Sequence, residues 1–501
     1  MRNSPVIFLI SMFFALLIGF LLSHFVKVGL PVSIGIGLLI FILPLIFQKP
    51  ELGLAMVAFF LPFERVPSIE LGGISIKIDH ILIIFVFVIF LIKNLIAKKL
   101  TIPKDPVRYL IILFISTLTF SLSTAINLER SLQVLVFMFL MFIVYLATTF
   151  IVSNKKVLIY VLYGLIFGAI FQGALGLFQF AGDAVGISST ITLLKEGYDK
   201  STFGFARVQG TAIEPLYFAN YILIPFFLSV ILLLRGQSGK LMNKIIFYAL
   251  SGVLMINFIL AISRGAYIAM AATILIMIIS QYKLILRAKA ILTTLVIVLL
   301  VSVGSYLALV KSEPRAIDEF VGHLMINDAT EGESVVSRVN ASQEAYEIFL
   351  DHPTFGAGLG NYGPIVQNDP PRVPDSGWFI VNNEYMELLA ENGVVGLLMF
   401  LVLLVFVFAR ALLGIKKETD QFVKAVLIGL TLALFGVLVQ YLTFSTLYIF
   451  HIWFLIGLIS ATSYLSLHPV RSGGSEAYGV NENAGENKRT GSEQSGPDLT
   501  G

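Results

Sequence analysis

Arg264 is the side chain whose position in the sequence most directly implies chemistry. It lies in the short joint 262–266 between two apolar segments, which holds it at or just below the surface of a membrane that both segments cross. An arginine at that depth is costly unless an anion pairs with it, and its planar fork of N–H donors matches phosphate. The position predicts a phosphate-binding site. The alternative is a side chain that reaches the lipid headgroups.

A second cation and a carboxylate come close together before another apolar segment. Arg207 and Glu214 flank a glycine, and Pro215 follows directly, so the chain bends here rather than continuing as a helix. The pair predicts either a charged site at the membrane face or a surface salt bridge in a loop. Lys77 opens another apolar segment in the same way and is a further candidate for a substrate-binding cation.

The polar segment 311–392, set between apolar segments, holds the remaining candidates. Residues 337–350, which include Arg338, have the apolar spacing of a helix. Residues 356–363 contain four glycines, and the exposed N–H groups of such a run can hold an anion. This run lacks the Gly-Lys-Ser/Thr ending of a nucleotide-binding loop, and we therefore predict no nucleotide site.

The end of this polar segment predicts a helix that stops at Gly393 and leads into the next apolar segment. Asn382, Asn383 and Glu384 cluster at the start of the helix. The two amides suit hydrogen bonds to a substrate, and the carboxylate is a candidate proton acceptor. Further carboxylates along the helix have a solvated face as their ordinary explanation.

The composition of the chain sets the class of fold that must position these residues. Of its 501 residues 57% are apolar and 13% are charged, so it cannot enclose a single water-soluble core. It predicts an all-α, polytopic membrane protein with about 12 to 14 transmembrane helices and one large, partly helical extracytoplasmic loop. The third span is short enough to be re-entrant. The candidate spans are 6–24, 28–48, 51–63, 80–97, 106–125, 131–152, 156–180, 216–235, 244–262, 265–282, 289–310, 393–412, 423–441 and 444–466.

Lysine and arginine residues cluster in alternate loops, which sets the predicted orientation. The pattern places the N-terminus in the cytoplasm and the polar segment outside it. We therefore predict four parts, which are an N-terminal bundle of about eleven spans (1–310), an extracytoplasmic loop domain (311–392), C-terminal transmembrane helices (393–468) and a disordered cytoplasmic tail (469–501).

Cysteine and histidine usage gives no sign of a metal or redox centre. The chain has no cysteine and six scattered histidines, so it offers neither a disulfide nor a recognisable metal-ligand spacing. We predict no metal and no cofactor. The net charge of +3 is the sum of a basic inner rim and an acidic outer loop, and it does not indicate nucleic-acid binding.

Taken in order, these segments resemble the O-antigen ligase and O-antigen polymerase family of polytopic membrane glycosyltransferases. The resemblance covers roughly residues 200–410 in motifs and the whole chain in layout. It rests on residues 263–268 (SRGAYI), the helix with Arg338, residues 356–362 (GAGLGNY) and residues 383–396 (NEYMELLAENGVVG), with the stretch 207–215 in support.

The resemblance implies a reaction. Members of this family transfer glycan from undecaprenyl pyrophosphate to an acceptor sugar hydroxyl on the outer face of the bacterial cytoplasmic membrane, without metal or nucleotide. By resemblance Arg264 binds the pyrophosphate, and Ile268 completes the family's arginine-x-x-x-leucine spacing. The implied partners are a lipid-linked oligosaccharide donor, a glycan or lipid-linked acceptor and the membrane lipids, with no nucleic acid. The substrate-binding candidates are Arg207, Arg338, Asn382, Asn383 and Lys77.

The chain departs from the family at the expected base. Ligases carry His-Asn at the start of the last loop helix, where this chain has Asn382 and Asn383. An asparagine cannot accept a proton near neutral pH, so the departure favours a polymerase or a more distant member of the family. Glu214 is the first candidate base because it lies near Arg207 at the membrane face. The further candidates are Glu384, Glu387, His323 and His352.

Three other functions remain open at this point. They are a ligase that joins glycan to lipid A–core, a transporter or flippase of lipid-linked sugars or small anions, and a non-catalytic scaffold of the envelope. Transporters commonly show two related halves, and we find no internal repeat. They also rarely place a polar domain of this length between late spans, which favours the enzyme.

Overall fold

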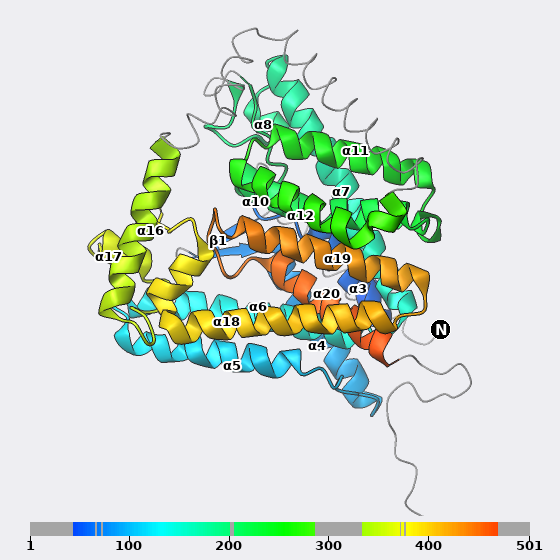
Figure 1. Cartoon of the computed structure of the whole chain (residues 1–501), viewed down its shortest axis with the longest axis horizontal. Helices are drawn as coiled ribbons and strands as arrows, with labels where there is room; N and C mark the ends of the chain where they lie inside the picture. Colours follow the sequence, from blue (N-terminus) through cyan, green and yellow to red (C-terminus); the bar gives the residue numbers. More distant parts are fainter. Residues whose placement is uncertain are drawn as a thin grey trace, which may run out of the picture.

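The computed structural model describes residues 44–65, 68–71, 74–200, 205–285, 333–370, 372–374 and 377–468. Within these residues the chain is predominantly helical (Figure 1). The helices are α3 (Pro50–Phe60), α4 (Ile78–Ile96), α5 (Val107–Phe120), η1 (Ser121–Thr124), α6 (Leu128–Ile151), α7 (Lys155–Ala184), α8 (Ser189–Thr192), α10 (Pro215–Leu234), η2 (Ser238–Lys240), α11 (Lys244–Leu260), α12 (Arg264–Ile285), α16 (Glu333–Asp351), α17 (Tyr362–Val366), α18 (Glu384–Lys417), α19 (Gln421–Gln440) and α20 (Phe450–Leu467).

Nine of the described helices are long and apolar enough to cross a membrane, and α3 and α11 are apolar but shorter. Every predicted span that lies within the described residues corresponds to one of these helices, so the all-α, polytopic membrane architecture is confirmed. The predicted spans 6–24 and 289–310, most of the span 28–48 and the predicted tail 469–501 lie outside the described residues.

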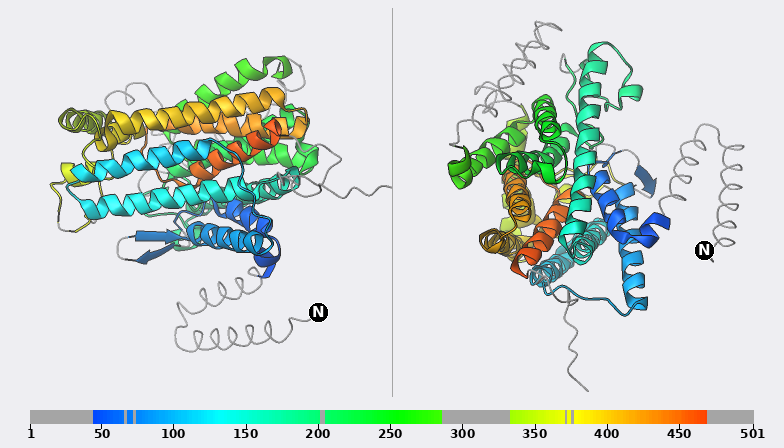
Figure 2. Two further views of the ribbon diagram at one scale, coloured as in Figure 1. Left: turned by 90° about the horizontal axis from the view of Figure 1, so that it is seen from below. Right: turned by 90° about the vertical axis from the view of Figure 1, so that its right-hand side faces the viewer.

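A small antiparallel hairpin departs from the all-α expectation. Strand β1 (Ser68–Leu71) pairs with β2 (Ile74–Lys77), and the register runs from Ser68↔Lys77 to Leu71↔Ile74. Two runs of alternating apolar residues separated by Gly-Gly are typical of such a hairpin. The hairpin leads directly into α4, beside which Figure 2 shows it.

Helices α10, α19 and α20 form the interior of the bundle. In the most apolar window of each, 78–83% of the residues are buried, against 28–39% in α4, α5, α12 and α18. The end view in Figure 2 shows α19 and α20 surrounded by other helices. The outer helices therefore present apolar faces to lipid, whereas polar groups on the inner helices must be satisfied by the protein itself.

Close approach of helix backbones is visible where α3 meets α7. Gly164 and Gly168 are four residues apart, which is the small-xxx-small spacing of membrane helix pairs. A Cβ atom added at Gly164 would lie 1.9 Å from the carbonyl oxygen of Ala55, and one added at Gly168 would lie 2.7 Å from that of Phe59. A side chain at either position would separate the two helices.

Helix α18 is interrupted at Gly393, as the sequence predicts. Gly393 has φ 63° and ψ −170°, which breaks the regular helical hydrogen bonding. Two carbonyl groups beside the break instead accept hydrogen bonds from the glycine-rich run 356–363. The N–H of Ala357 donates to Ala390 at 2.9 Å, and the N–H of Gly358 donates to Glu391 at 3.0 Å. The break therefore anchors this loop.

Several inter-helix segments meet at one end of the bundle, on the left in Figure 1. The Ser131 hydroxyl at the start of α6 donates to the Leu359 carbonyl at 2.7 Å. The N–H of Asn382, just before α18, donates to the Ser445 hydroxyl at 3.0 Å. Loop 441–449, which joins α19 to α20, thus contacts the start of α18, and this end of the bundle carries the candidate site.

Candidate functional site

Three of the predicted cations lie together, although they come from three separate segments. Arg207 precedes α10, Arg264 is the first residue of α12 and Arg338 lies on α16. Burial lowers the pKa of Arg207 and of Arg338, and in each case the positive charge of Arg264 contributes to the lowering. We call these three side chains the arginine cluster.

Arg207 holds its position through contacts with the joint that carries Arg264. Its Nη2 donates to the carbonyl of Ile262 at 2.8 Å. Its guanidinium carbon lies 5.6 Å from the centre of the Tyr198 ring, and its backbone N–H donates to the Tyr198 carbonyl at 2.8 Å. The loop before α10 and the turn before α12 are therefore braced against each other, which keeps the first two arginines in register.

Glu214 lies beside the arginine cluster. It is the residue before the first turn of α10, but its side chain does not cap that helix. The Tyr198 hydroxyl instead hydrogen-bonds to it, and burial together with the Glu214 charge raises the pKa of Tyr198 to about 12. Glu214 also interacts electrostatically with Arg207. The Glu214 carboxylate can accept a hydrogen bond from a substrate group close to the cations, or it can take the proton from that group.

The joint behind Arg264 is packed tightly against loop 441–449. A Cβ atom added at Gly265 would lie 1.9 Å from the hydroxyl oxygen of Thr443, so the residue after Arg264 must be a glycine for this packing to persist. Loop 441–449 in turn binds the start of α18. The N–H of Glu384 donates to the Tyr441 carbonyl at 2.9 Å, and the N–H of Thr446 donates to Oε2 of Glu384 at 2.7 Å.

The two asparagines before α18 have different surroundings. Oδ1 of Asn383 accepts hydrogen bonds from the N–H groups of Tyr385 and Met386 at 3.2 and 3.3 Å, which makes it the N-cap of the helix. Asn382 is half-buried with φ 58°, and its Nδ2 makes only a long contact of 3.5 Å to the Ile380 carbonyl. Of the two, only Asn382 therefore has a side-chain amide that is mostly available for hydrogen bonds to another molecule.

Lys77 is placed in a different charged group. It is the residue before the first turn of α4, and its charge acts on Glu64 and Asp79, which are both buried. An oxygen of Glu64 lies 3.4 Å from Nδ1 of His451, and Nε2 of that histidine lies 2.8 Å from Oδ1 of Asn220. This buried polar chain connects the hairpin to the interior helices α10 and α20.

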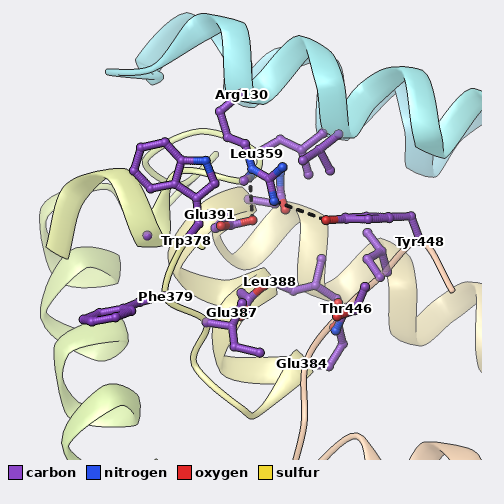
Figure 3. Close-up of a pocket in the computed structure, with 16 residues that line it drawn as sticks. Arg130, Leu359, Trp378, Phe379, Glu384, Glu387, Leu388, Glu391, Thr446 and Tyr448 are labelled. Carbon is purple, nitrogen blue, oxygen red and sulfur yellow. Dashed lines mark hydrogen bonds between the residues drawn. The ribbon is translucent and has the colours of Figure 1, made fainter. Parts of the chain in front are cut away.

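A second cluster of charge occupies the first turns of α18. Glu384, Glu387 and Glu391 recur at helical spacing and line a cavity of about 40 Å³ (Figure 3). We call it the carboxylate cavity. Arg130 at the start of α6 interacts electrostatically with the second and third of these carboxylates. The rest of the lining includes Leu359, Gly360, Trp378, Phe379, Asn392, Thr446 and Tyr448.

The side chain of Glu391 binds the backbone of the glycine-rich run 356–363. Its Oε2 accepts a hydrogen bond from the N–H of Gly360 at 2.7 Å, and its Oε1 accepts one from the N–H of Tyr362 at 3.0 Å. The N–H of Leu359 donates to Ser121. The anion that this run holds is therefore a carboxylate of the protein itself, which agrees with the absence of a nucleotide-loop motif.

The remaining base and metal candidates are also placed. His352 is exposed just after α16, and His323 lies outside the described residues. Among the residues that the structure describes, no group of three histidine, aspartate or glutamate side chains is arranged to hold a metal ion.

Sequence reasoning missed Arg130, loop 441–449 and the pair Glu64 and His451. Arg130 could have been found, because it sits in a short polar joint between two apolar segments, as Arg264 does. Loop 441–449 carries serine, threonine and tyrosine rather than charge, and no motif distinguishes such residues before the fold is known.

Comparison with known families gives one match. Residues 248–401 match the family model described as O-antigen ligase. The match includes Arg264, Arg338 and the carboxylates of α18, whereas Arg207, Glu214 and loop 441–449 lie outside it. A search of curated proteins finds no match to the chain.

Proposed function

We propose that this chain, which belongs to the O-antigen ligase family through residues 248–401, is a polymerase of lipid-linked glycans. In this proposal it transfers glycan from undecaprenyl pyrophosphate to a sugar hydroxyl of an acceptor glycan. The family match and the fold make the chain a polytopic membrane protein with a domain of the O-antigen ligase and polymerase type.

The observation that carries the proposal is the convergence of Arg207, Arg264 and Arg338. Three guanidinium groups at a partly buried place, with Glu214 beside them, carry more positive than negative charge and favour a ligand with several negative charges. A pyrophosphate is such a ligand, and negative charge grows on its oxygens as it leaves the sugar carbon. Fixed arginines stabilise that charge in the transition state, as donors of an oxyanion site do.

The carboxylate of Glu214 completes the reaction. The acceptor hydroxyl oxygen forms a bond to the anomeric carbon, the bond from that carbon to the pyrophosphate oxygen breaks, and the hydroxyl proton passes to Glu214. The leaving group keeps the electron pair of the broken bond and remains on the arginine cluster. Supporting this assignment, Glu214 interacts electrostatically with Arg207 and is hydrogen-bonded by Tyr198, so it sits at the cations with a defined orientation.

A polymerase is favoured over a ligase by Asn382. The residue lies half-buried at the start of α18 and cannot take up a proton there, although it can orient an acceptor through hydrogen bonds. A ligase that joins glycan to lipid A–core would use the same arginines, so the two enzymes differ in the acceptor and in the base.

The site faces the outside of the cytoplasmic membrane in this proposal, as the distribution of lysine and arginine supports. A reporter fused near Asn340 should be active only outside the cytoplasm, and one fused after Lys416 only inside. A cytoplasmic signal from the fusion near Asn340 would contradict the proposal, because the lipid-linked donor would then face the wrong side.

The function is tested by reconstitution in liposomes with a defined undecaprenyl-pyrophosphate oligosaccharide and a metal chelator. We expect products with added repeat units and release of undecaprenyl pyrophosphate. Arg372→Ala is a matched control, because this arginine belongs to the same polar segment and is exposed. Movement of the donor across the bilayer without a new glycosidic bond would identify a transporter instead.

A further inference from the structure

We infer that the carboxylate cavity is the subsite that holds the acceptor saccharide by its hydroxyl groups. The inference rests on the proposed function, because it names the molecule that the transferred glycan joins. It assigns binding roles to Arg130, Trp378, Glu384 and Glu387, which bring together α6, the segment before α18 and α18 itself (Figure 3).

Two carboxylates leave an oxygen available to a ligand. Oε2 of Glu384 accepts a hydrogen bond from Thr446, and Oε2 of Glu387 accepts hydrogen bonds from Val381 and Ser445. Neither Oε1 atom accepts a hydrogen bond from the part of the chain that the structure describes. The protein thus uses one oxygen of each to fix the side chain, and the second oxygen can accept a hydrogen bond from a hydroxyl group.

A buried amide oxygen points to the same conclusion independently. Asn392 lines the cavity, is 1% exposed and donates from Nδ2 to the Ser121 hydroxyl at 2.9 Å. Its Oδ1 has no hydrogen-bond partner among the described residues. A buried amide oxygen without a partner is unfavourable, and a hydroxyl group or water molecule in the cavity removes that penalty.

Arg130 supplies the complementary donors. Its Nη2 donates to the Tyr448 hydroxyl at 3.2 Å, a bond that Figure 3 shows, and its Nε has no hydrogen-bond partner in the part of the chain that the structure describes. A sugar hydroxyl both donates and accepts, so a cavity with carboxylate oxygens on one side and guanidinium N–H groups on the other satisfies it in both directions.

The aromatic side chains provide a surface for the sugar ring. Trp378 is half-buried at the cavity, and Phe379 next to it is 52% exposed, although large aromatic side chains usually bury most of their area. Figure 3 shows both rings on the side of α16 and α17, away from Thr446. Apolar and aromatic surface with a few convergent polar groups is the usual composition of a small-molecule site.

The chemistry of the lining excludes other ligand classes. No arrangement of three metal-binding side chains occurs in the described part of the chain, so three nearby glutamates do not form a cation site. Arg130 is the one cation in the described lining, against three glutamates, so the cavity offers little to hold an anionic ligand. A hydroxyl-rich saccharide without acidic groups remains as the class that the lining fits.

The size of the cavity determines how much of a saccharide enters. A volume of about 40 Å³ holds a few water molecules and no complete sugar ring. We therefore place only one hydroxyl-bearing edge of a ring in the cavity, where its hydroxyls replace those waters. The face of the ring then lies against Trp378.

The cavity is connected to the arginine cluster through one loop residue. The N–H of Thr446 binds Glu384, and its hydroxyl lies 3.0 Å from that of Tyr217 on α10. Tyr217 interacts electrostatically with Glu214. Thr446 and Tyr217 therefore connect an acceptor held in the carboxylate cavity with the base that takes its proton.

The chain provides a natural reporter for this subsite, because it has only two tryptophans, Trp378 and Trp453. Trp453 is 1% exposed and lies in α20, so Trp453→Phe leaves Trp378 as the single tryptophan of the full-length protein, and its emission can be excited selectively over that of tyrosine. We expect a saturable change of its emission when lipid-free repeat-unit oligosaccharide of the source bacterium is added. Inorganic pyrophosphate, which the arginine cluster would bind, should produce no comparable change.

Substitutions in this background test the assignment. Glu387→Gln and Glu384→Gln should each weaken oligosaccharide binding by about tenfold, the effect of losing one charged hydrogen bond. Glu347→Gln on α16 is the matched control and should leave binding unchanged, because Glu347 is exposed. In steady-state kinetics Trp378→Leu should raise KM for the acceptor about tenfold and leave KM for the donor unchanged, and Trp378→Phe should recover most of the loss.

The outcomes separate this inference from the proposed function. The subsite is overturned if the emission of Trp378 does not change when the oligosaccharide is added and the acceptor KM of Trp378→Leu is unchanged. This holds even if transfer depends on Arg264. Equal binding by the glutamine variants and the control also overturns it. If instead the oligosaccharide binds and no variant of Arg264 affects transfer, the subsite holds and the proposed role of the arginine cluster fails.

Discussion

The arginine cluster and the carboxylate cavity lie at the same end of the helical bundle, and each gathers like charges. The cations of the cluster come from three segments that are far apart in the sequence, whereas the carboxylates of the cavity follow one another along α18. Arg207 is held by a carbonyl and an aromatic ring, but Glu391 is held by two backbone N–H groups.

This difference indicates two kinds of ligand. Backbone N–H groups already occupy both oxygens of Glu391, so part of the carboxylate cavity serves the fold, and one oxygen each of Glu384 and Glu387 is left for hydroxyl groups. Burial lowers the pKa values of Arg207 and Arg338, and repulsion by the charge of Arg264 lowers both further. Cations assembled in this way suit a ligand with more than one negative charge.

The largest effect is expected at Arg264. Arg264→Ala should lower the rate of glycan transfer by about 1,000-fold, the upper end for losing one transition-state donor, while the protein still inserts and accumulates. Arg264→Lys should remain strongly impaired, because a point charge cannot replace the planar fork. Transfer rates in membranes with equal amounts of protein measure this. Full activity of the alanine variant would remove Arg264 from the site.

Glu214 ranks second. Glu214→Gln should lower turnover about 100-fold with little change in donor binding, because the shape of the side chain is kept and its basicity is lost. Asn382→Ala should have a smaller effect, since an asparagine there can only orient the acceptor. Turnover of both variants on one donor measures the ranking. An indispensable Asn382 with a dispensable Glu214 would reverse the assignment and make Glu384 the next carboxylate to test.

Glu391 is expected to affect stability more than chemistry. Glu391→Ala should lower the free energy of unfolding by about 2 kcal/mol, because the buried N–H groups of Gly360 and Tyr362 lose their acceptor. Thermal unfolding of the purified protein in detergent measures the loss, with Glu347→Ala as the exposed control. A variant as stable as the control would show that the glycine-rich run does not depend on this carboxylate.

The smallest effect is expected at Asn383, where substitutions distinguish a helix cap from a residue that binds substrate. Asn383→Ala should destabilise the protein by about 1 kcal/mol, and Asn383→Asp should retain both stability and acceptor KM, because aspartate caps a helix as well as asparagine does. Thermal unfolding and acceptor titration measure the two properties. A raised acceptor KM in the stable aspartate variant would place Asn383 in contact with substrate, as the sequence had suggested.

Much of the fold can be predicted from local sequence. Apolar segments of sufficient length predict membrane helices wherever the structure describes them, and Gly393 marks the break in α18. Such features depend on composition and on backbone conformation near one residue, so no tertiary information is needed. The hairpin before α4 departs from the all-α prediction, because strands of four residues each give only a short alternating pattern in the sequence.

The site is less accessible to sequence reasoning. Arg264 stands out because of its position between two apolar segments, but the same reasoning was not applied to Arg130. Lys77 was grouped with the arginines, and the structure places it with buried Glu64 instead. The contact of Glu64 with His451 and that of loop 441–449 with α18 join residues far apart in the chain, and a single sequence contains no signal for either.

The most direct test of the account is whether the arginine cluster binds pyrophosphate. The purified protein should bind undecaprenyl pyrophosphate at least about tenfold more tightly than undecaprenyl phosphate in an equilibrium measurement. The difference is what one additional charged contact contributes. Arg264→Ala should lose this preference, and Arg372→Ala should keep it. Equal affinity for the two lipids in the unsubstituted protein, or an unchanged preference in Arg264→Ala, would contradict the central claim.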